Sequence, residues 1–303
     1  MITIRVDTKN KFAFSQLDPF GRLDILKLQG AFAIGSVDDS GEYDVPAALM
    51  VCMPEKDRLV VDWMYTLPEY RGQGLGSGLL ILAFEEASAR GFYDVAARIS
   101  SEYDGEEGGW DPESFFVNDV FSEIEQDEQV FRTRVSLIEK RLREDEKKNK
   151  MSSDRKEVLS LSEISEADFK NVYVSLEKNF GKSFLYPLKT LIQGADPNVS
   201  ILRIEGRECT GAVFVLKGDF TWYVLGLAPL DYEETEEIIR AALYRFEDYA
   251  RPDDIIEIML RRKAAKKALS LLDLPGEEME ICYYTATVSD FEKQKELMKE
   301  YEV

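Results

Sequence analysis

The segment Leu67–Gly78 constrains the fold of this chain most strongly, because a β-like run ends before it and an apolar helical run begins after it. The segment reads Leu-Pro-Glu-Tyr-Arg-Gly-Gln-Gly-Leu-Gly-Ser-Gly. Its four glycines allow the backbone to approach a ligand closely. The N–H groups in the first turn of the following helix would point at an anion, and helix N-termini favour negative charge. The segment therefore predicts a phosphate-binding turn.

Two common phosphate loops do not fit this spacing. A Walker A loop is excluded because no Gly-Lys-Ser or Gly-Lys-Thr closes the segment, and a dinucleotide loop is excluded because the third glycine of Gly-x-Gly-x-x-Gly is missing. The pattern Arg-x-x-Gly-x-Gly is present as Arg71, Gly74 and Gly76, and Pro68 lies three residues upstream. This pattern closely resembles the acyl-CoA pyrophosphate loop of the GNAT N-acetyltransferase superfamily.

The segments around the loop agree with this resemblance. Residues 58–67 are rich in β-formers, residues 79–90 form an apolar helical pattern, Gly91 is placed to cap that helix, and residues 92–99 return as a strand. The family has this order of strand, loop, helix and strand. The alternative interpretation is a glycine-rich turn that binds no ligand.

Composition limits the chemistry that this chain can perform. The chain has 303 residues, 45% of them hydrophobic, which suits about two domains. It contains no histidine, and its three cysteines, Cys52, Cys209 and Cys282, form no CxxC pair. Ser-His-Asp and Cys-His catalysis are therefore excluded, and so are the commonest zinc sites. We expect no metal, and an acid or base must be a carboxylate, tyrosine, lysine, cysteine or water.

The charge and the hydropathy pattern limit the partners. The formal net charge of −20 argues against nucleic acid, because a phosphate backbone requires a basic surface. A cationic small-molecule amine is compatible with this charge, and a solvated acidic surface explains the charge equally well. No window approaches about 20 apolar residues, and the first residues lack the apolar stretch of a signal peptide. We therefore expect a cytoplasmic protein that does not bind membranes.

The chain is predicted to consist of two similar halves. The charged segment 139–156 contains neither glycine nor aromatic residues and is interpreted as a linker whose start suits a helix. It separates the predicted domains 1–138 and 157–303. After it, residues 199–204 and 211–216 suit a hairpin, 220–227 a strand and 232–249 an amphipathic helix.

A constant offset relates the two halves. It pairs Pro68 with Pro229, Arg90 with Arg251 and Val95 with Ile256. Both halves therefore resemble GNAT domains, which implies an α/β (mixed α+β) fold class: two tandem domains, each with a mixed, mostly antiparallel central sheet flanked by helices.

The second half differs where the first has its glycine loop. Under the constant offset Arg71 and Gly74 correspond to Tyr232 and Thr235, within the acidic segment Asp231–Glu237. A pyrophosphate would not bind among these carboxylates. We therefore interpret the C-terminal half as a degenerate copy that keeps the fold without the cofactor.

The resemblance implies that acetyl-CoA binds to the N-terminal half. The backbone of Met64 and Thr66 would bind the pantetheine arm and the acetyl carbonyl group, although Thr66 departs from the usual aliphatic residue. The pyrophosphate would lie on the loop residues Arg71, Gly72, Gln73, Gly74, Leu75, Gly76 and Ser77.

The resemblance also implies that an amine attacks acetyl-CoA directly, so that a proton must leave the amine and another must reach the thiolate. Uniform strand alternation predicts that Val60, Asp62, Met64 and Thr66 share one face. Asp62 is the candidate catalytic base, directly or through a water. Its alternatives are a role in substrate binding and an ordinary carboxylate that faces solvent.

The expected acid of the family is absent from its usual position. Phe116 stands where the family has tyrosine, and Val120 stands where it has glycine. Tyr103 is the candidate catalytic substitute, and it is also compatible with an ordinary loop aromatic. Otherwise the thiolate leaves without a protein acid, or the domain is not catalytic.

Together these observations predict a transferase, namely a tandem-domain acyltransferase that moves an acetyl group from acetyl-CoA to a primary amine of a small molecule or peptide. The alternative is a non-catalytic acyl-CoA-binding sensor or interaction protein with a GNAT fold. Two fused copies can mimic the homodimer that many relatives form, so we expect a monomer or a homodimer.

Overall fold

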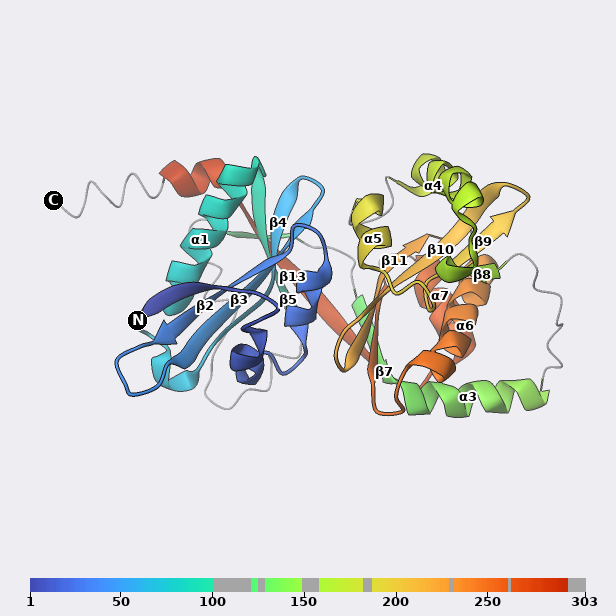
Figure 1. The fold of residues 1–303 in the computed structure, drawn as a ribbon, viewed down its shortest axis with the longest axis horizontal. Helices are drawn as coiled ribbons and strands as arrows, with labels where there is room; N and C mark the ends of the chain where they lie inside the picture. The colour runs from blue at the N-terminus through green and yellow to red at the C-terminus, as the bar shows by residue number, and fades with distance from the viewer. Residues whose placement is uncertain are drawn as a thin grey trace. The chain divides into compact units, whose positions relative to one another are not determined.

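The computed structural model describes residues 1–100, 121–124, 129–148, 158–181, 187–228, 232–260 and 263–293. The chain divides into two compact units (Figure 1). The N-terminal unit comprises Met1–Asp127 together with Glu280–Val303, and the C-terminal unit comprises Glu128–Met279. Each unit is a mixed, mostly antiparallel sheet flanked by helices, which confirms the predicted fold class.

The sheet of the N-terminal unit has the strand order β1-β2-β3-β4-β5-β13. Adjacent strands are antiparallel except β4 and β5, which are parallel. The strands are β1 (Ile2–Val6), β2 (Phe32–Asp38), β3 (Val45–Glu55), β4 (Arg58–Thr66), β5 (Asp94–Ser100) and β13 (Glu277–Thr287), and the short β6 (Ser122–Ile124) also pairs with β13. The helix α1 (Leu75–Arg90) connects β4 to β5, as the apolar periodicity predicts.

Both faces of this sheet are covered by apolar side chains. On one face, α1 packs with Leu79, Ala83, Phe84 and Ala87, which recur at helical spacing and form a buried stripe. On the other face lie two short 3₁₀ helices, η1 (Lys11–Leu17) and η2 (Arg22–Lys27). Phe14, Leu17 and Leu23 of these helices pack against Trp63 of β4. The strands β3 and β4 lie at the centre of this sheet. Packing on both faces therefore fixes the end of β4, where the glycine loop begins.

A β-bulge interrupts β4 at Asp62. Val61 lies opposite Cys52 of β3, and Trp63 lies opposite Val51, which is adjacent to Cys52. Asp62 is therefore the extra residue. As a result Val61 and Met64 both pack on the α1 side, whereas Trp63 and the residues that alternate with it pack on the other side. The uniform alternation predicted for this strand is therefore wrong, because one inserted residue reverses the faces of everything after it.

The sheet of the C-terminal unit has the strand order β7-β12-β11-β10-β9-β8. Here β11 and β12 are parallel, and the other adjacent strands are antiparallel. The strands are β7 (Gln129–Arg134), β8 (Val158–Ser160), β9 (Ile201–Glu205), β10 (Glu208–Lys217), β11 (Thr221–Ala228) and β12 (Ile255–Leu260). The helices are α3 (Val135–Lys148), α4 (Glu166–Phe180), α5 (Leu188–Gly194), α6 (Tyr232–Tyr249) and α7 (Lys263–Leu272).

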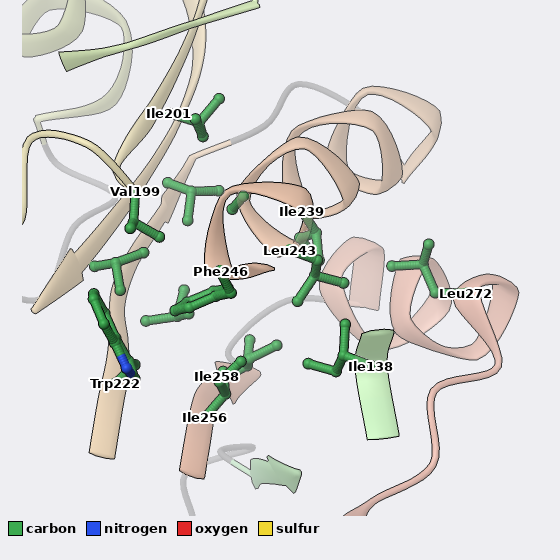
Figure 2. Close-up of a cluster of buried hydrophobic side chains, with 14 of the residues drawn as sticks. Ile138, Val199, Ile201, Trp222, Ile239, Leu243, Phe246, Ile256, Ile258 and Leu272 are labelled. Carbon is green, nitrogen blue, oxygen red and sulfur yellow. The ribbon is translucent and has the colours of Figure 1, made fainter. Parts of the chain in front are cut away.

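The core of the C-terminal unit forms between α6 and the sheet. Figure 2 shows Ile239, Leu243 and Phe246 of α6 directed toward the sheet residues, among them Ile258. The ring of Phe246 meets that of Trp222 edge to face, with the ring centroids 5.3 Å apart. The amphipathic pattern predicted for residues 232–249 therefore corresponds to a helix that buries one face.

The two units share one plan. Going from one edge of each sheet to the other, β1 to β5 and then β13 correspond to β8, β9, β10, β11, β12 and then β7, with α1 corresponding to α6. This agreement confirms that the two halves are copies of one architecture.

The chain exchanges the last strand of each copy. The strand β7 follows β5 in the sequence but pairs with β12, and β13 follows β12 in the sequence but pairs with β5. The division consequently differs from the expected domains 1–138 and 157–303: α3 overlaps the expected linker 139–156 and lies in the C-terminal unit, and residues 280–303 belong to the N-terminal unit. Composition marks a charged segment, but it does not reveal which sheet edge a strand joins.

The connection before the helix differs between the copies. Residues 67–74 separate β4 from α1, whereas only residues 229–231, which lie outside the described residues, separate β11 from α6. Tyr232 begins α6 as Leu75 begins α1, so the constant offset that paired Arg71 with Tyr232 is wrong here. The second copy lacks the length of chain that forms the glycine loop.

In the part of the chain that the structure describes, none of the helices combines the length and the apolar character needed to span a lipid bilayer.

Candidate functional site

A cavity of about 410 Å³ lies between the end of β4 and the start of α1. It is lined by Met64, Tyr65, Thr66, Tyr70, Arg71, Gly72, Gly74, Leu75, Gly76 and Ser77. The structure thus brings together all of the predicted cofactor-binding residues except Gln73, whose side-chain amide donates to the carbonyl oxygen of Glu69 at 3.2 Å. Tyr65 and Tyr70 line the cavity without having been predicted.

The glycines of the loop are required by backbone conformation. Gly72 has φ +76° and Gly74 has φ +79°, in the left-handed region that side chains disfavour. No heavy atom lies within 4 Å of a Cβ added at either position, so crowding by the protein is not the reason for glycine. The open space above both residues instead allows a ligand to approach the backbone.

The first turn of α1 supplies hydrogen-bond donors to this space. Gly74 is the N-cap, and the N–H of Gly78 closes the first turn on the carbonyl oxygen of Gly74 at 2.9 Å. The N–H groups of Leu75, Gly76 and Ser77 precede that bond and have no carbonyl one turn earlier within the helix. These donors, together with the positive end of the helix dipole, fit a pyrophosphate group.

Arg71 holds a positive charge at the cavity wall. Its Nε donates to the carbonyl oxygen of Thr66 at 3.0 Å, and its guanidinium lies 5.5 Å from the centre of the Tyr65 ring. Both contacts are made with the last two residues of β4, Tyr65 and Thr66, so the end of the strand fixes Arg71 beside the loop. A guanidinium in this position complements an anionic ligand.

Tyr70 ties the loop to the end of β2. Its hydroxyl donates to Oδ2 of Asp38 at 3.0 Å, and Oδ1 of the same carboxylate accepts from the hydroxyl of Ser40 at 2.7 Å. The hydrogen bond to Asp38 raises the pKa of Tyr70, while hydrogen bonds from Ser40 and then from Tyr70 lower the pKa of Asp38. Tyr70 therefore stays a neutral phenol, and sequence reasoning missed it because its partner lies far away along the chain.

The strands β4 and β5 pair only at their beginnings. Their parallel register runs from Arg58–Asp94 to Val61–Ala97, although both strands continue beyond. The edge of β4 from Met64 to Thr66 consequently borders the cavity instead of β5. Backbone donors and acceptors on such an edge are available to an extended ligand.

Asp62 lies apart from this cavity. Its side chain is 0% exposed, and its Oδ1 accepts from Nη1 of Arg98 at 2.7 Å. Val95, Ala97 and Ile99 of β5 pack on the α1 side, so strand alternation places Arg98, and with it Asp62, on the opposite face. Oδ2 of Asp62 is buried without a hydrogen-bond partner among the described residues.

The candidate acid cannot be located in the same way. Tyr103, Phe116 and Val120 lie outside the described residues, and the role suggested for Tyr103 stays a prediction.

Residues 11–104 match the model of the Acetyltransferase (GNAT) family. This range contains the strands β2, β3 and β4, the glycine loop, α1 and β5. The N-terminal unit carries a GNAT domain. The family match and the cavity at the N-terminus of α1 thus concern the same residues.

Solved structures share this fold along nearly the whole chain. A GCN5-related N-acetyltransferase from Sphaerobacter thermophilus is 12% identical, with a TM-score of 0.62 and coverage of 95% of both chains. A tandem GNAT protein from the clavulanic acid biosynthesis pathway is 11% identical, with a TM-score of 0.56 and coverage of 95% of this chain and 98% of the other. A putative acetyltransferase from Pyrococcus horikoshii is 13% identical, with a TM-score of 0.56 and coverage of 94% and 89%.

These likenesses concern the fold, because the identities are low. The comparison with curated proteins gave no match. The GNAT domain and the tandem GNAT fold are therefore shown, and the residues of the cavity define the candidate site.

A second cavity, of about 350 Å³, lies in the C-terminal unit. Its carboxylates serve the local backbone and side chains: Glu163 accepts from the N–H of Ser160 and from Arg245, and Asp168 accepts from the hydroxyl of Ser165. Ser165, the N-cap of α4, lines this cavity, but no counterpart of the glycine loop lies among its described lining residues.

Proposed function

We propose that the GNAT domain binds acetyl-CoA and transfers its acetyl group to a primary amine of a small molecule or peptide. The observation that carries this proposal is the cavity in which the end of β4, beyond its last described pair with β5, meets a glycine loop and the N-terminus of α1. A strand edge suits the amide-rich pantetheine arm, and the helix start suits the pyrophosphate. The membership of residues 11–104 in an acetyltransferase family supports the same proposal.

Each part of the site has a distinct task in this proposal. The N–H groups of Leu75, Gly76 and Ser77 and the guanidinium of Arg71 bind the pyrophosphate. The backbone of Met64 and Thr66 orients the pantetheine arm and the acetyl carbonyl group. Acetyl-CoA supplies the acetyl group as a thioester, and the protein contributes mainly position and orientation.

The acceptor must lose a proton before its nitrogen can attack. An ammonium has no lone pair, so a nearby carboxylate or an ordered water has to take this proton. Asp62 is the proposed acceptor of the proton because it is the bulged residue of β4 where β4 separates from β5, so the amine would approach from the sheet face opposite α1. A cationic amine also agrees with the formal net charge of −20.

A non-catalytic acyl-CoA sensor is the second candidate. It is favoured by Phe116, which stands where the family has the tyrosine that acts as general acid. Such a protein would bind acetyl-CoA without releasing free CoA in the presence of any amine. We propose that the protein acts as a monomer or homodimer and that nucleic acid is not its partner.

Calorimetric titration of acetyl-CoA into wild type and the double variant Arg71→Glu/Gly74→Glu tests the cofactor site. We expect micromolar binding by wild type and at least about 10-fold weaker binding by the variant, because two carboxylates would face the pyrophosphate. Release of free CoA thiol with spermidine, glucosamine and lysine amide then separates the transferase from the sensor.

The matched control is Gly206→Glu/Arg207→Glu in the C-terminal unit. Gly206 also has positive φ, +64°, with open space around an added Cβ, and Arg207 is exposed. This control repeats the change in charge and the backbone strain away from the cavity, so its acetyl-CoA affinity should equal that of wild type. Absence of binding by folded wild type would contradict the proposed function.

A further inference from the structure

Asp62 and Arg98 form a buried ion pair at the point where β4 and β5 separate. The last parallel pair of these strands is Val61–Ala97, and the next residue of each strand is Asp62 or Arg98. Nη1 of Arg98 lies 2.7 Å from Oδ1 of Asp62, and the two side chains are 9% and 0% exposed. Burial of two charges is costly, so such a pair requires a reason.

The C-terminal unit provides an internal comparison, because its strands separate at the corresponding place. The last parallel pair there is Val224–Ile258. The register of β11 against β10 shifts after Val224, which makes Leu225 the extra residue of a bulge. The residue of β12 that follows the last pair is Met259.

Leu225 and Met259 therefore correspond to Asp62 and Arg98. The copy without the glycine loop has two apolar residues where the copy with the loop has a buried ion pair. Since β11 and β12 separate at two apolar residues, this fold does not need an ion pair at the point of separation; the nearby buried pair of Arg132 and Glu257 joins β7 to β12 instead. The ion pair is thus present in the copy that has the candidate site, and the shared architecture does not require it.

The carboxylate of Asp62 is only half satisfied. Arg98 holds Oδ1, whereas Oδ2 is buried and has no hydrogen-bond partner among the residues that the structure describes. An unsatisfied buried carboxylate oxygen costs free energy, and such groups recur where a ligand or a catalytic event supplies the missing partner. The bulge that aims this side chain is also a device common beside active sites.

We propose that Arg98 is a positioning residue, which holds the Asp62 carboxylate by Oδ1 so that Oδ2 receives the acceptor amine. This inference rests on the proposed function and adds to it a residue that acts through Asp62. Oδ2 takes one proton from the ammonium, directly or through one water, and later releases it to solvent. The nitrogen lone pair forms a C–N bond with the acetyl carbonyl carbon, the C–S bond breaks with its electron pair on sulfur, and the second proton of the nitrogen passes to the thiolate.

The test uses Arg98→Met, which copies Met259, and Arg98→Lys, which restores a positive charge. With the best acceptor among spermidine, glucosamine and lysine amide, we expect kcat of Arg98→Met to fall by at least about 10-fold, because the carboxylate loses its orientation. The affinity for acetyl-CoA should stay near that of wild type, and Arg98→Lys should recover most of kcat. The thermal midpoint of Arg98→Met should fall, because the buried carboxylate of Asp62 loses its counter-charge, so kcat is measured well below that midpoint. The double variant Asp62→Leu/Arg98→Met copies the C-terminal unit, so it should fold and bind acetyl-CoA without turnover.

The matched control is the buried ion pair of the C-terminal unit, in which Nη2 of Arg132 lies 2.6 Å from Oε1 of Glu257. The variant Arg132→Met/Glu257→Leu should keep wild-type turnover. Unchanged kcat in Arg98→Met would overturn the inference and leave the proposed function intact. Equal losses in Arg98→Met and the Arg132→Met/Glu257→Leu control would also overturn it, because both would then act through stability. Wild type that does not bind acetyl-CoA, or that binds it without turnover, would overturn the proposed transferase and this inference together.

Discussion

Phe32 shows how single contacts tie the N-terminal unit together around its site. Its ring is 2% exposed and lies between two guanidinium groups, those of Arg5 at 4.3 Å and Arg90 at 4.6 Å. Both arginines also pair with Glu86 of α1, at 2.9 and 2.8 Å. The cluster fastens the end of α1 to β1 and β2, so it supports the helix whose other end borders the cavity.

Phe32→Ala should lower the free energy of unfolding by about 3–5 kcal/mol, the usual cost of removing a buried phenyl ring, and it also deprives both guanidinium groups of their aromatic partner. Urea unfolding measures this effect. The control Phe12→Ala changes a ring that is 71% exposed, and it should cost less than about 0.5 kcal/mol. Equal effects of the two substitutions would contradict the described packing of Phe32.

Among the elements, α1 combines two kinds of glycine. Gly74 adopts positive φ at the N-cap, whereas Gly78 lies inside the helix with open space around an added Cβ. The first glycine is required by the turn that forms the cavity. The second occupies an ordinary helical position, where alanine has the better helix propensity.

The two glycines should therefore respond to alanine with opposite signs. Gly78→Ala should raise the free energy of unfolding by about 0.5–1 kcal/mol, and Gly74→Ala should lower it by about 1 kcal/mol, because an L-residue is strained at φ +79°. Thermal unfolding followed by circular dichroism measures both changes. A stabilising Gly74→Ala would show that the turn does not need its left-handed conformation.

At the level of the whole chain, the exchanged strands make each unit depend on a distant segment. β13 lies beside β5, and Tyr283 and Tyr284 of β13 are 0% and 1% exposed. The GNAT domain therefore needs residues that the sequence places after the C-terminal unit. Without them β5 would present an unpaired edge, which is a hazard for aggregation.

A chain that ends at Met279 should lose acetyl-CoA binding although its glycine loop is intact. The expected cause is the exposed edge of β5 and the loss of the buried aromatic rings. Calorimetry measures the binding, and a synthetic peptide of residues 280–293 should restore part of it in trans. Full binding by the truncated chain would show that β13 is dispensable for the GNAT domain.

Local signals were sufficient to predict the glycine loop, the elements around it and the presence of two copies. Glycines with positive φ, the apolar periodicity of α1 and the β-rich run of β4 all express preferences of neighbouring residues. Most of the cavity-lining residues lie in one continuous segment, which is why they could be named from their order along the chain.

Other features required the packed structure, because they join residues that are far apart in sequence. Every strand edge offers the same backbone donors and acceptors, so nothing local to β13 specifies that it pairs with β5. The bulge at Asp62 depends on the register against β3, and its ion pair depends on Arg98 in another strand. The chain's local preferences define the glycine loop, whereas long-range packing decides which strand completes each sheet and which residue holds the carboxylate of Asp62.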